Sequence, residues 1–368
     1  MFTNVIYNCK QKVVYFCNMN RLDLDTLEKW YLNNYEDKLL GRRIVLEDIE
    51  PIINSLKSPF AVKQLGTSEE DRNIYHITLG TGPKKILLWS QMHGNESTGT
   101  KALFDLFKYV EDHLDNDLIK DLLKTCTLIF IPMLNPDGST NFTRVNANDI
   151  DLNRDAVDLK AKESNLLRDV LNNFNPHFCF NLHDQRTIFN VEGFKNPATI
   201  SFLAPSVDEE RTLTNGRKET MAAIVAMNAT LQETIPNYVG RYTDEFYPTA
   251  TGDNFQKLGH NTILIEAGHY PGDYNRNIVR KYNFYAILSG LKYLVYHNDY
   301  TNFEPYFDIP NNGKQNYDFI FRNVIDDQNN QVDIAFQYEY EVVNNELVSK
   351  LVEYQRGDLK EFNAYNEF

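Results

Sequence analysis

Short apolar runs alternate with amphipathic helical segments from about residue 85 to residue 297, and this alternation limits the folds open to the chain. Four of the runs have the length of buried strands: 86–89, 127–134, 178–182 and 262–265. Segments with helical periodicity lie between and after them: 97–114, 159–174, 209–235, with possible breaks near Asn215 and Gly216, and 278–297. The pattern predicts an α/β fold, in which helices cover both faces of a mostly parallel or mixed sheet.

The two ends of the chain have other patterns. Residues 22–40 and 44–56 predict helices, and a charged turn between residues 60–65 and 74–79 predicts a hairpin. After residue 298, three strand-like runs are separated by polar turns: 318–324, 332–340 and 347–353. We therefore expect three regions, namely an N-terminal helical segment, a main domain and a small C-terminal β appendage, at 1–59, 60–298 and 311–368.

Composition narrows the classes of partner and compartment. The net charge of −14 argues against nucleic acid or an anionic membrane as a partner. Residues 1–20 lack an uninterrupted apolar signal sequence, and no run reaches the roughly 18 apolar residues of a transmembrane helix. We expect a cytoplasmic protein, whose start is Met1 or Met19. The four cysteines show no CxxC spacing and predict no disulfide framework.

Polar side chains follow three of the buried runs directly. His93 and Glu96 come after the first run, His183 after the third and Glu266 after the fourth. Because ligands bind beyond the carboxyl ends of strands in such sheets, we expect these side chains to meet. Imidazole and carboxylate groups bind zinc, and a catalytic zinc takes three protein ligands. The spacing of His93 and Glu96 alone also fits a polar surface loop. The prediction of a zinc site therefore depends on the positions of these residues, His183 and Glu266 at strand ends on one edge of the sheet.

Two motifs carry a resemblance to a known family. One is His-Gly-Asn-Glu at 93–96; the other combines Asn-Pro-Asp-Gly at 135–138, Arg144 and Asp-Leu-Asn-Arg at 151–154. Over roughly residues 60–297 the chain resembles the zinc carboxypeptidases. The resemblance implies a catalytic domain at 60–298 that holds one zinc ion and hydrolyses an amide bond next to a free carboxylate. The implied zinc ligands are His93, Glu96 and His183.

The resemblance also implies roles for residues around the metal. Glu266 matches the general base, a role that a carboxylate beside an activated water can fill. Arg144 matches the arginine that stabilises the oxyanion of the transition state. Asn153 and Arg154 match the pair that binds the terminal carboxylate of the substrate, and Asp151 matches the carboxylate that orients a zinc-bound imidazole.

Two further assignments concern the polar, tyrosine-rich loop at 237–254. Tyr247 matches the family's mobile tyrosine that covers the bound substrate, and Tyr242 is a rival for that role. Asp253 or Asn254 falls near the pocket that receives the side chain of the departing residue. An acid in that pocket would favour a basic or amine-bearing side chain.

The spacing of the ligands leaves the substrate open. The interval from Glu96 to His183 is shorter than in digestive carboxypeptidases. It is closer to that of bacterial cell-wall peptide amidases, aspartoacylase and succinylglutamate desuccinylase. The expected substrate is therefore a peptide or an acyl amino acid with a free carboxylate, and N-acyl amino acid deacylase and cell-wall amidase are the alternative activities. A non-catalytic zinc-binding protein is disfavoured, since it would need neither Glu266 nor Arg144.

Overall fold

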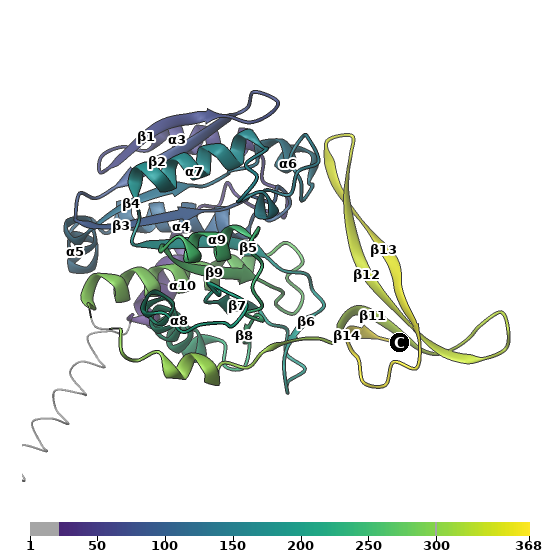
Figure 1. Cartoon of the computed structure of the whole chain (residues 1–368). Coiled ribbons are helices and arrows are strands. Elements are labelled where there is room, and N and C mark those ends of the chain that lie inside the picture. The colour runs from purple at the N-terminus through teal and green to yellow at the C-terminus, as the bar shows by residue number, and fades with distance from the viewer. Residues whose placement is uncertain (1–21, 299) are drawn as a thin grey trace, which may run out of the picture.

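The computed structural model describes residues 22–298 and 300–368. The two alternative starts, Met1 and Met19, lie outside these residues, as does the beginning of the expected N-terminal segment. Figure 1 shows an α/β body whose central sheet lies between helices, with a second sheet at one side of the body.

The central sheet has eight strands in the order β1-β2-β4-β3-β5-β9-β7-β8. The inner strands β4, β3, β5 and β9 are parallel, whereas β1 and β2 form an antiparallel hairpin and β7 runs antiparallel to β9. The bounds are β1 Phe60–Thr67, β2 Asn73–Leu79, β3 Lys84–Trp89, β4 Cys126–Ile131, β5 Phe178–Asp184, β7 Ile200–Leu203, β8 Val239–Arg241 and β9 Asn261–Ala267.

Both faces of this sheet are buried, which explains the continuous apolar runs of its inner strands. Along β3, Ile86 and Leu88 belong to one hydrophobic cluster, and Leu87 and Trp89 belong to another on the opposite face. The first face packs against α4 (Thr98–Asp112), α8 (Asn215–Thr234) and α10 (Asn277–Tyr296). The second packs against α7 (Lys162–Phe174) and α9 (Thr251–Lys257).

Shorter elements complete the body. They are α2 Leu24–Asn34, α3 Leu46–Ser55, α5 Asp117–Thr125, α6 Pro136–Asn141, η1 Leu152–Arg154, β6 Phe189–Val191, η2 Glu304–Asp308 and β10 Asn312–Lys314. None of the helices in the described ranges combines the length and the apolarity needed to cross a bilayer.

The C-terminal sheet has four strands in the order β13-β12-β11-β14. Their bounds are β11 Asn316–Ile325, β12 Gln331–Val343, β13 Glu346–Gly357 and β14 Asn363–Glu367. A shared apolar cluster, which includes Ile188 and Val191 of the body and Tyr317 and Ile320 of the sheet, joins the two. From this base the long β12–β13 hairpin extends alongside the body towards α6 (Figure 1).

The predicted fold class is confirmed, and several local expectations are wrong. The helix expected at 209–235 begins only at Asn215, because Thr214 caps it by accepting a hydrogen bond from the Arg217 backbone N–H. The helix expected at 22–40 ends at Asn34. The polar stretches at 139–154 and 237–254, expected as loops, contain the end of α6, the turn η1 and the start of α9. Strand β14 was not expected, because its polar sequence has no apolar alternation.

Candidate metal centre and active-site cavity

Two loops at the carboxyl edge of the sheet meet with their backbones in contact. The loop after β3 carries His93 and Glu96, and the segment after β4 continues into α6 and the loop with Arg144. An ideal Cβ placed on Gly94 would lie 1.9 Å from the carbonyl carbon of Gly138. Gly94 cannot carry a side chain without separating the two loops. A Cβ on Gly138 would instead lie 2.6 Å from the Asn135 side chain and from the Val145 carbonyl oxygen, within its own segment. These contacts explain why each motif contains a glycine.

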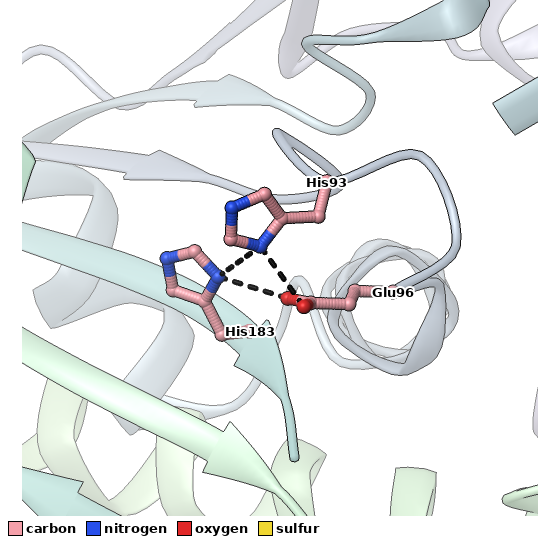
Figure 2. A group of neighbouring side chains, drawn as sticks. All are labelled: His93, Glu96 and His183. Atoms are coloured by element: carbon pink, nitrogen blue, oxygen red, sulfur yellow. Dashed lines mark hydrogen bonds and ion pairs between the residues drawn. The ribbon is translucent and has the colours of Figure 1, made fainter. Parts of the chain in front are cut away.

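The structure brings His93, Glu96 and His183 together, as Figure 2 shows. Their ligand atoms all lie within 4.8 Å of one another, and the three side chains are buried. The two Nδ1 atoms are 3.1 Å apart, and each lies 2.9 Å from an oxygen of Glu96.

This donor set fits a zinc ion. Ligand atoms about 2.1 Å from a tetrahedral zinc are separated by about 3.4 Å, close to the spacing of these three groups. Burial favours the neutral form of Glu96, but the neighbouring His93 and His183 outweigh it and hold the pKa of this carboxyl well below its usual value. The carboxyl is therefore ionised, as a metal ligand must be.

Asp151 connects the metal centre to Arg144. One oxygen of Asp151 accepts a hydrogen bond from Nε2 of His93 at 3.0 Å, which leaves Nδ1 of that ring to face the centre. The other oxygen accepts from Nε of Arg144 at 2.9 Å. The Arg144 guanidinium is thereby held 3.4 Å from Oε1 of Glu96. His93 and Arg144 together lower the pKa of Asp151 against the opposing effect of burial.

Asn153 and Arg154 lie on one turn of 3₁₀-helix, η1, which explains their adjacent placement. Asp151 caps this turn by accepting from the Asn153 backbone N–H. The Asn153 side chain accepts from the backbone N–H of Thr251, and Nη1 of Arg154 donates to the Asn153 carbonyl at 2.8 Å. The turn is thus fixed to α9, and both side chains line the cavity described next.

A cavity of about 460 Å³ opens beside the metal centre. Seven of the residues predicted from the sequence line it: His93, Glu96, Arg144, Asn153, Arg154, His183 and Glu266. Burial raises the pKa of Glu266 well above its usual value, and the charges of Glu96 and Asp184 add to this effect. A carboxyl with a raised pKa beside a metal centre is suited to accept and return a proton.

Tyr247 and Asp253 do not line this cavity. Tyr247 is 46% exposed, and its hydroxyl donates to Glu245 at 3.1 Å. Its ring centroid lies 5.8 Å from the guanidinium of Arg154, so it stands beside a residue that lines the cavity. Asp253 is buried and accepts from the Tyr247 backbone N–H at 3.3 Å. The rival residue, Tyr242, does line the cavity.

Several residues that the sequence patterns did not single out also line the cavity, among them Arg42, Asn95, Asp184 and Arg186. Arg186 and Asp184 follow His183 closely, so their position in the chain was a usable signal. Arg42 precedes α3 in the N-terminal segment, and no pattern in the sequence connects it with the strand ends. His269, three residues beyond Glu266, packs with tilted rings against Tyr274 and Tyr365 and is not among the lining residues.

Comparisons with known proteins agree with this geometry. The family profile described as zinc carboxypeptidase matches residues 50–321. A probable carboxypeptidase 2 of Trichophyton verrucosum is 27% identical over 127 residues, which cover 32% of this chain and 24% of the relative. The chain therefore matches about a quarter of that relative's length.

Solved structures share the fold. A metallo-carboxypeptidase from Burkholderia cenocepacia superposes with a TM-score of 0.52 at 20% identity, over 66% of each chain. Bovine thrombin-activatable fibrinolysis inhibitor, solved with a tick carboxypeptidase inhibitor, gives 0.54 at 14% identity, over 70% of this chain and 98% of its own.

Proposed function

We propose, from the premise that this chain belongs to the zinc carboxypeptidase family, that it hydrolyses the amide bond next to a free carboxylate in a peptide or peptide-like acid. The observation that carries the proposal is the single cavity that contains the metal-ligand triad, Glu266 and Arg154. A ligand triad alone would also suit a binding protein. A base and a carboxylate-binding arginine beside it match the needs of hydrolysis.

His93, Glu96 and His183 would hold one zinc ion, which supplies Lewis-acid activation of the carbonyl and of a water. Glu266 then takes a proton from the attacking water as the water oxygen bonds to the carbonyl carbon. It returns that proton to the amine nitrogen as the carbon–nitrogen bond breaks. The second proton of the water leaves the new carboxylic acid, so one amide bond and one water give a carboxylate, an amine and one proton, which the amine can take up.

The remaining residues position the substrate. Arg144, fixed by Asp151, supports the oxyanion at the point where charge develops. Asn153 and Arg154 bind the terminal carboxylate, since the planar guanidinium accommodates both carboxylate oxygens. Tyr247 closes over the bound substrate from beside Arg154. Asp253, which contacts the Tyr247 backbone and does not line the cavity itself, favours a basic departing residue through its charge.

The proposal is tested with a panel of substrates. Zinc-loaded protein is incubated with peptides that have free or amidated C-termini, with N-acyl amino acids and with cell-wall peptides, and products are identified by mass spectrometry. We expect release of one residue from free-acid peptides only, loss of this activity on chelation, and recovery with zinc. The amidated peptide is the matched control, since it lacks only the carboxylate that Arg154 would bind.

Other outcomes reassign the activity. Cleavage confined to the acyl amino acids would make the protein a deacylase, and cleavage confined to cell-wall peptides would make it an amidase. Absence of turnover by protein that holds one zinc ion per chain would contradict the hydrolase proposal.

A further inference from the structure

A second cavity, of about 340 Å³, adjoins the active-site cavity. The two share Arg42, Asn95 and Arg186 among their lining residues. The outer cavity is bounded on its far side by the C-terminal sheet, through Tyr338 and Tyr340 of β12 and other residues of the hairpin. The family profile ends at residue 321, so β12 and β13 are additions of this chain to the matched region.

The β12–β13 hairpin is fixed at both ends, so the wall that it forms has a defined position. At its base it belongs to the apolar cluster that joins the sheet to the body. At its tip, the backbone and side-chain oxygens of Asn345 accept hydrogen bonds from Arg43 at 3.1 and 3.0 Å. Arg43 also donates to the carbonyl of Thr140 in α6. Figure 1 shows the hairpin tip beside α6.

Hairpin side chains position two cations at the junction of the cavities. The guanidinium of Arg42 lies 4.6 Å from the ring centroid of Tyr340, and it donates to the backbone carbonyl of Tyr274. Nη1 of Arg186 lies 3.5 Å from the hydroxyl of Tyr354. Across residues 22–298 and 300–368, no carboxylate forms an ion pair with either arginine.

Acidic groups nearby have other neighbours. Asp184 accepts a hydrogen bond from Thr98, and Glu266 lines the inner cavity. Burial raises the pKa of Asp184, and the charges of Arg276 and Arg42 oppose this effect without forming an ion pair with it. Glu339, at the outer cavity, is exposed and lies 3.9 Å from Lys350. Within the described parts of the chain, the guanidinium groups of Arg42 and Arg186 thus have no carboxylate in an ion pair and can bind the anion of a ligand.

The lining residues also indicate which end of a substrate reaches this place. Asn153 and Arg154 line the inner cavity and not the outer one. If the terminal carboxylate binds Arg154 and the scissile carbonyl lies at the metal centre, the amino side of the substrate leaves past Arg42 and Arg186.

We propose that the β12–β13 hairpin completes a subsite for the residues on the amino side of the scissile bond, in which Arg42 and Arg186 select an acidic side chain. The inference rests on the proposed hydrolase function for the direction of the substrate. The protein's net charge of −14 repels acidic peptides in general, so a preference for them must arise locally.

Binding to the full-length, zinc-loaded Glu266→Gln variant tests the subsite without turnover. The ligands are hexapeptides with a free C-terminal carboxylate, identical except for Glu or Gln at the two positions before the last residue. We expect the Glu peptide to bind about tenfold more tightly by calorimetry, as one charge-assisted contact allows. Adding Arg186→Gln should reduce the ratio of the two dissociation constants, Gln peptide to Glu peptide, to about twofold.

Arg356→Gln is the matched control, since Arg356 is on the same hairpin, pairs with Glu353 and lines neither cavity. It should keep the tenfold ratio. Equal binding of the two peptides, no binding of either, or a ratio that survives both Arg186→Gln and Arg42→Gln would overturn the subsite. Acid-selective binding without turnover by the parent protein would instead overturn the hydrolase proposal and leave the acidic-peptide site standing.

Discussion

His183 on β5 and Glu266 on β9 are direct register partners in the parallel pair at the centre of the sheet. The side chains of register partners point to the same face of the sheet. A metal ligand and the proposed base are therefore neighbours through backbone geometry alone. No loop has to fold to bring them together. This arrangement lets the two roles be separated by mutation, because each side chain can be altered on an unchanged strand.

Replacing the proposed base should remove catalysis and leave the metal in place. Glu266→Gln keeps the size of the side chain but cannot accept the proton, so we expect kcat/KM to fall by about 10²- to 10⁴-fold. Zinc content, measured by elemental analysis, should stay at one ion per chain. His183→Ala is the contrasting variant and should lose the zinc. Full activity in Glu266→Gln would show that another group is the base.

Asp151 should support metal binding and Arg144 together. Asp151→Asn removes a charged acceptor from both His93 and Arg144. We expect zinc affinity to fall by about 10- to 100-fold, as for other carboxylates that orient a ligating imidazole. A competition titration with a chelator measures the affinity, and kcat at saturating zinc reports on Arg144. Unchanged values for both would mean that the contacts seen here do not matter in solution.

Tyr247 should contribute to substrate binding from beside Arg154. Its hydroxyl donates a hydrogen bond to Glu245, and its ring stands near Arg154. Tyr247→Phe should therefore raise KM about fivefold, equivalent to one hydrogen bond, with little change in kcat. Steady-state kinetics with a free-acid peptide provides the measurement. If Tyr242→Phe shows this effect and Tyr247→Phe does not, Tyr242 is the covering tyrosine.

Asp253 should make stability depend on pH. Burial raises the pKa of Asp253 to about 6. Between its usual pKa and this value the folded protein keeps a proton that the unfolded chain releases, so the free energy of unfolding falls as pH rises. The loss should reach about 3 kcal/mol above pH 6.

Asp253→Asn does not titrate, and its side-chain oxygen can still accept from the Tyr247 N–H. In urea unfolding, the variant should therefore gain stability relative to the parent as pH rises from 4 to 6.5. If the free energies of unfolding of the parent and the variant change in parallel over this pH range, Asp253 has the same pKa in the folded and the unfolded protein. The same variant, assayed with peptides that end in lysine or leucine, tests the proposed basic preference.

The sequence predicted the parts of the site that follow from strand ends. Apolar runs mark β3, β5 and β9, and parallel pairing then brings His93, His183 and Glu266 to one edge. The positions of Tyr247 and Tyr242 depend on a loop whose path is decided by tertiary contacts, such as the hydrogen bond from the Tyr242 backbone N–H to the Phe202 carbonyl. Periodicity carries no information about such contacts.

Contacts between distant segments were also beyond prediction. The alternation in β12 and β13 indicated strands, but nothing local to Tyr340 or Tyr354 shows that these residues lie beside Arg42 and Arg186. The start of α8 was misplaced because a threonine cap, which is a local signal, was outweighed by charged residues with helical preference before it.

The contact between Gly94 and Gly138 has a consequence for how this protein can evolve. Because the Gly94 backbone lies against that of Gly138 and Ser139, a side chain at position 94 requires the second loop to move, and a single substitution of Gly94 will rarely succeed. The β12–β13 hairpin has no such constraint on most of its exposed side chains. On the proposed function and subsite, reaction chemistry and substrate choice occupy parts of the molecule with different tolerance to mutation, and new specificities should be sought by varying the hairpin.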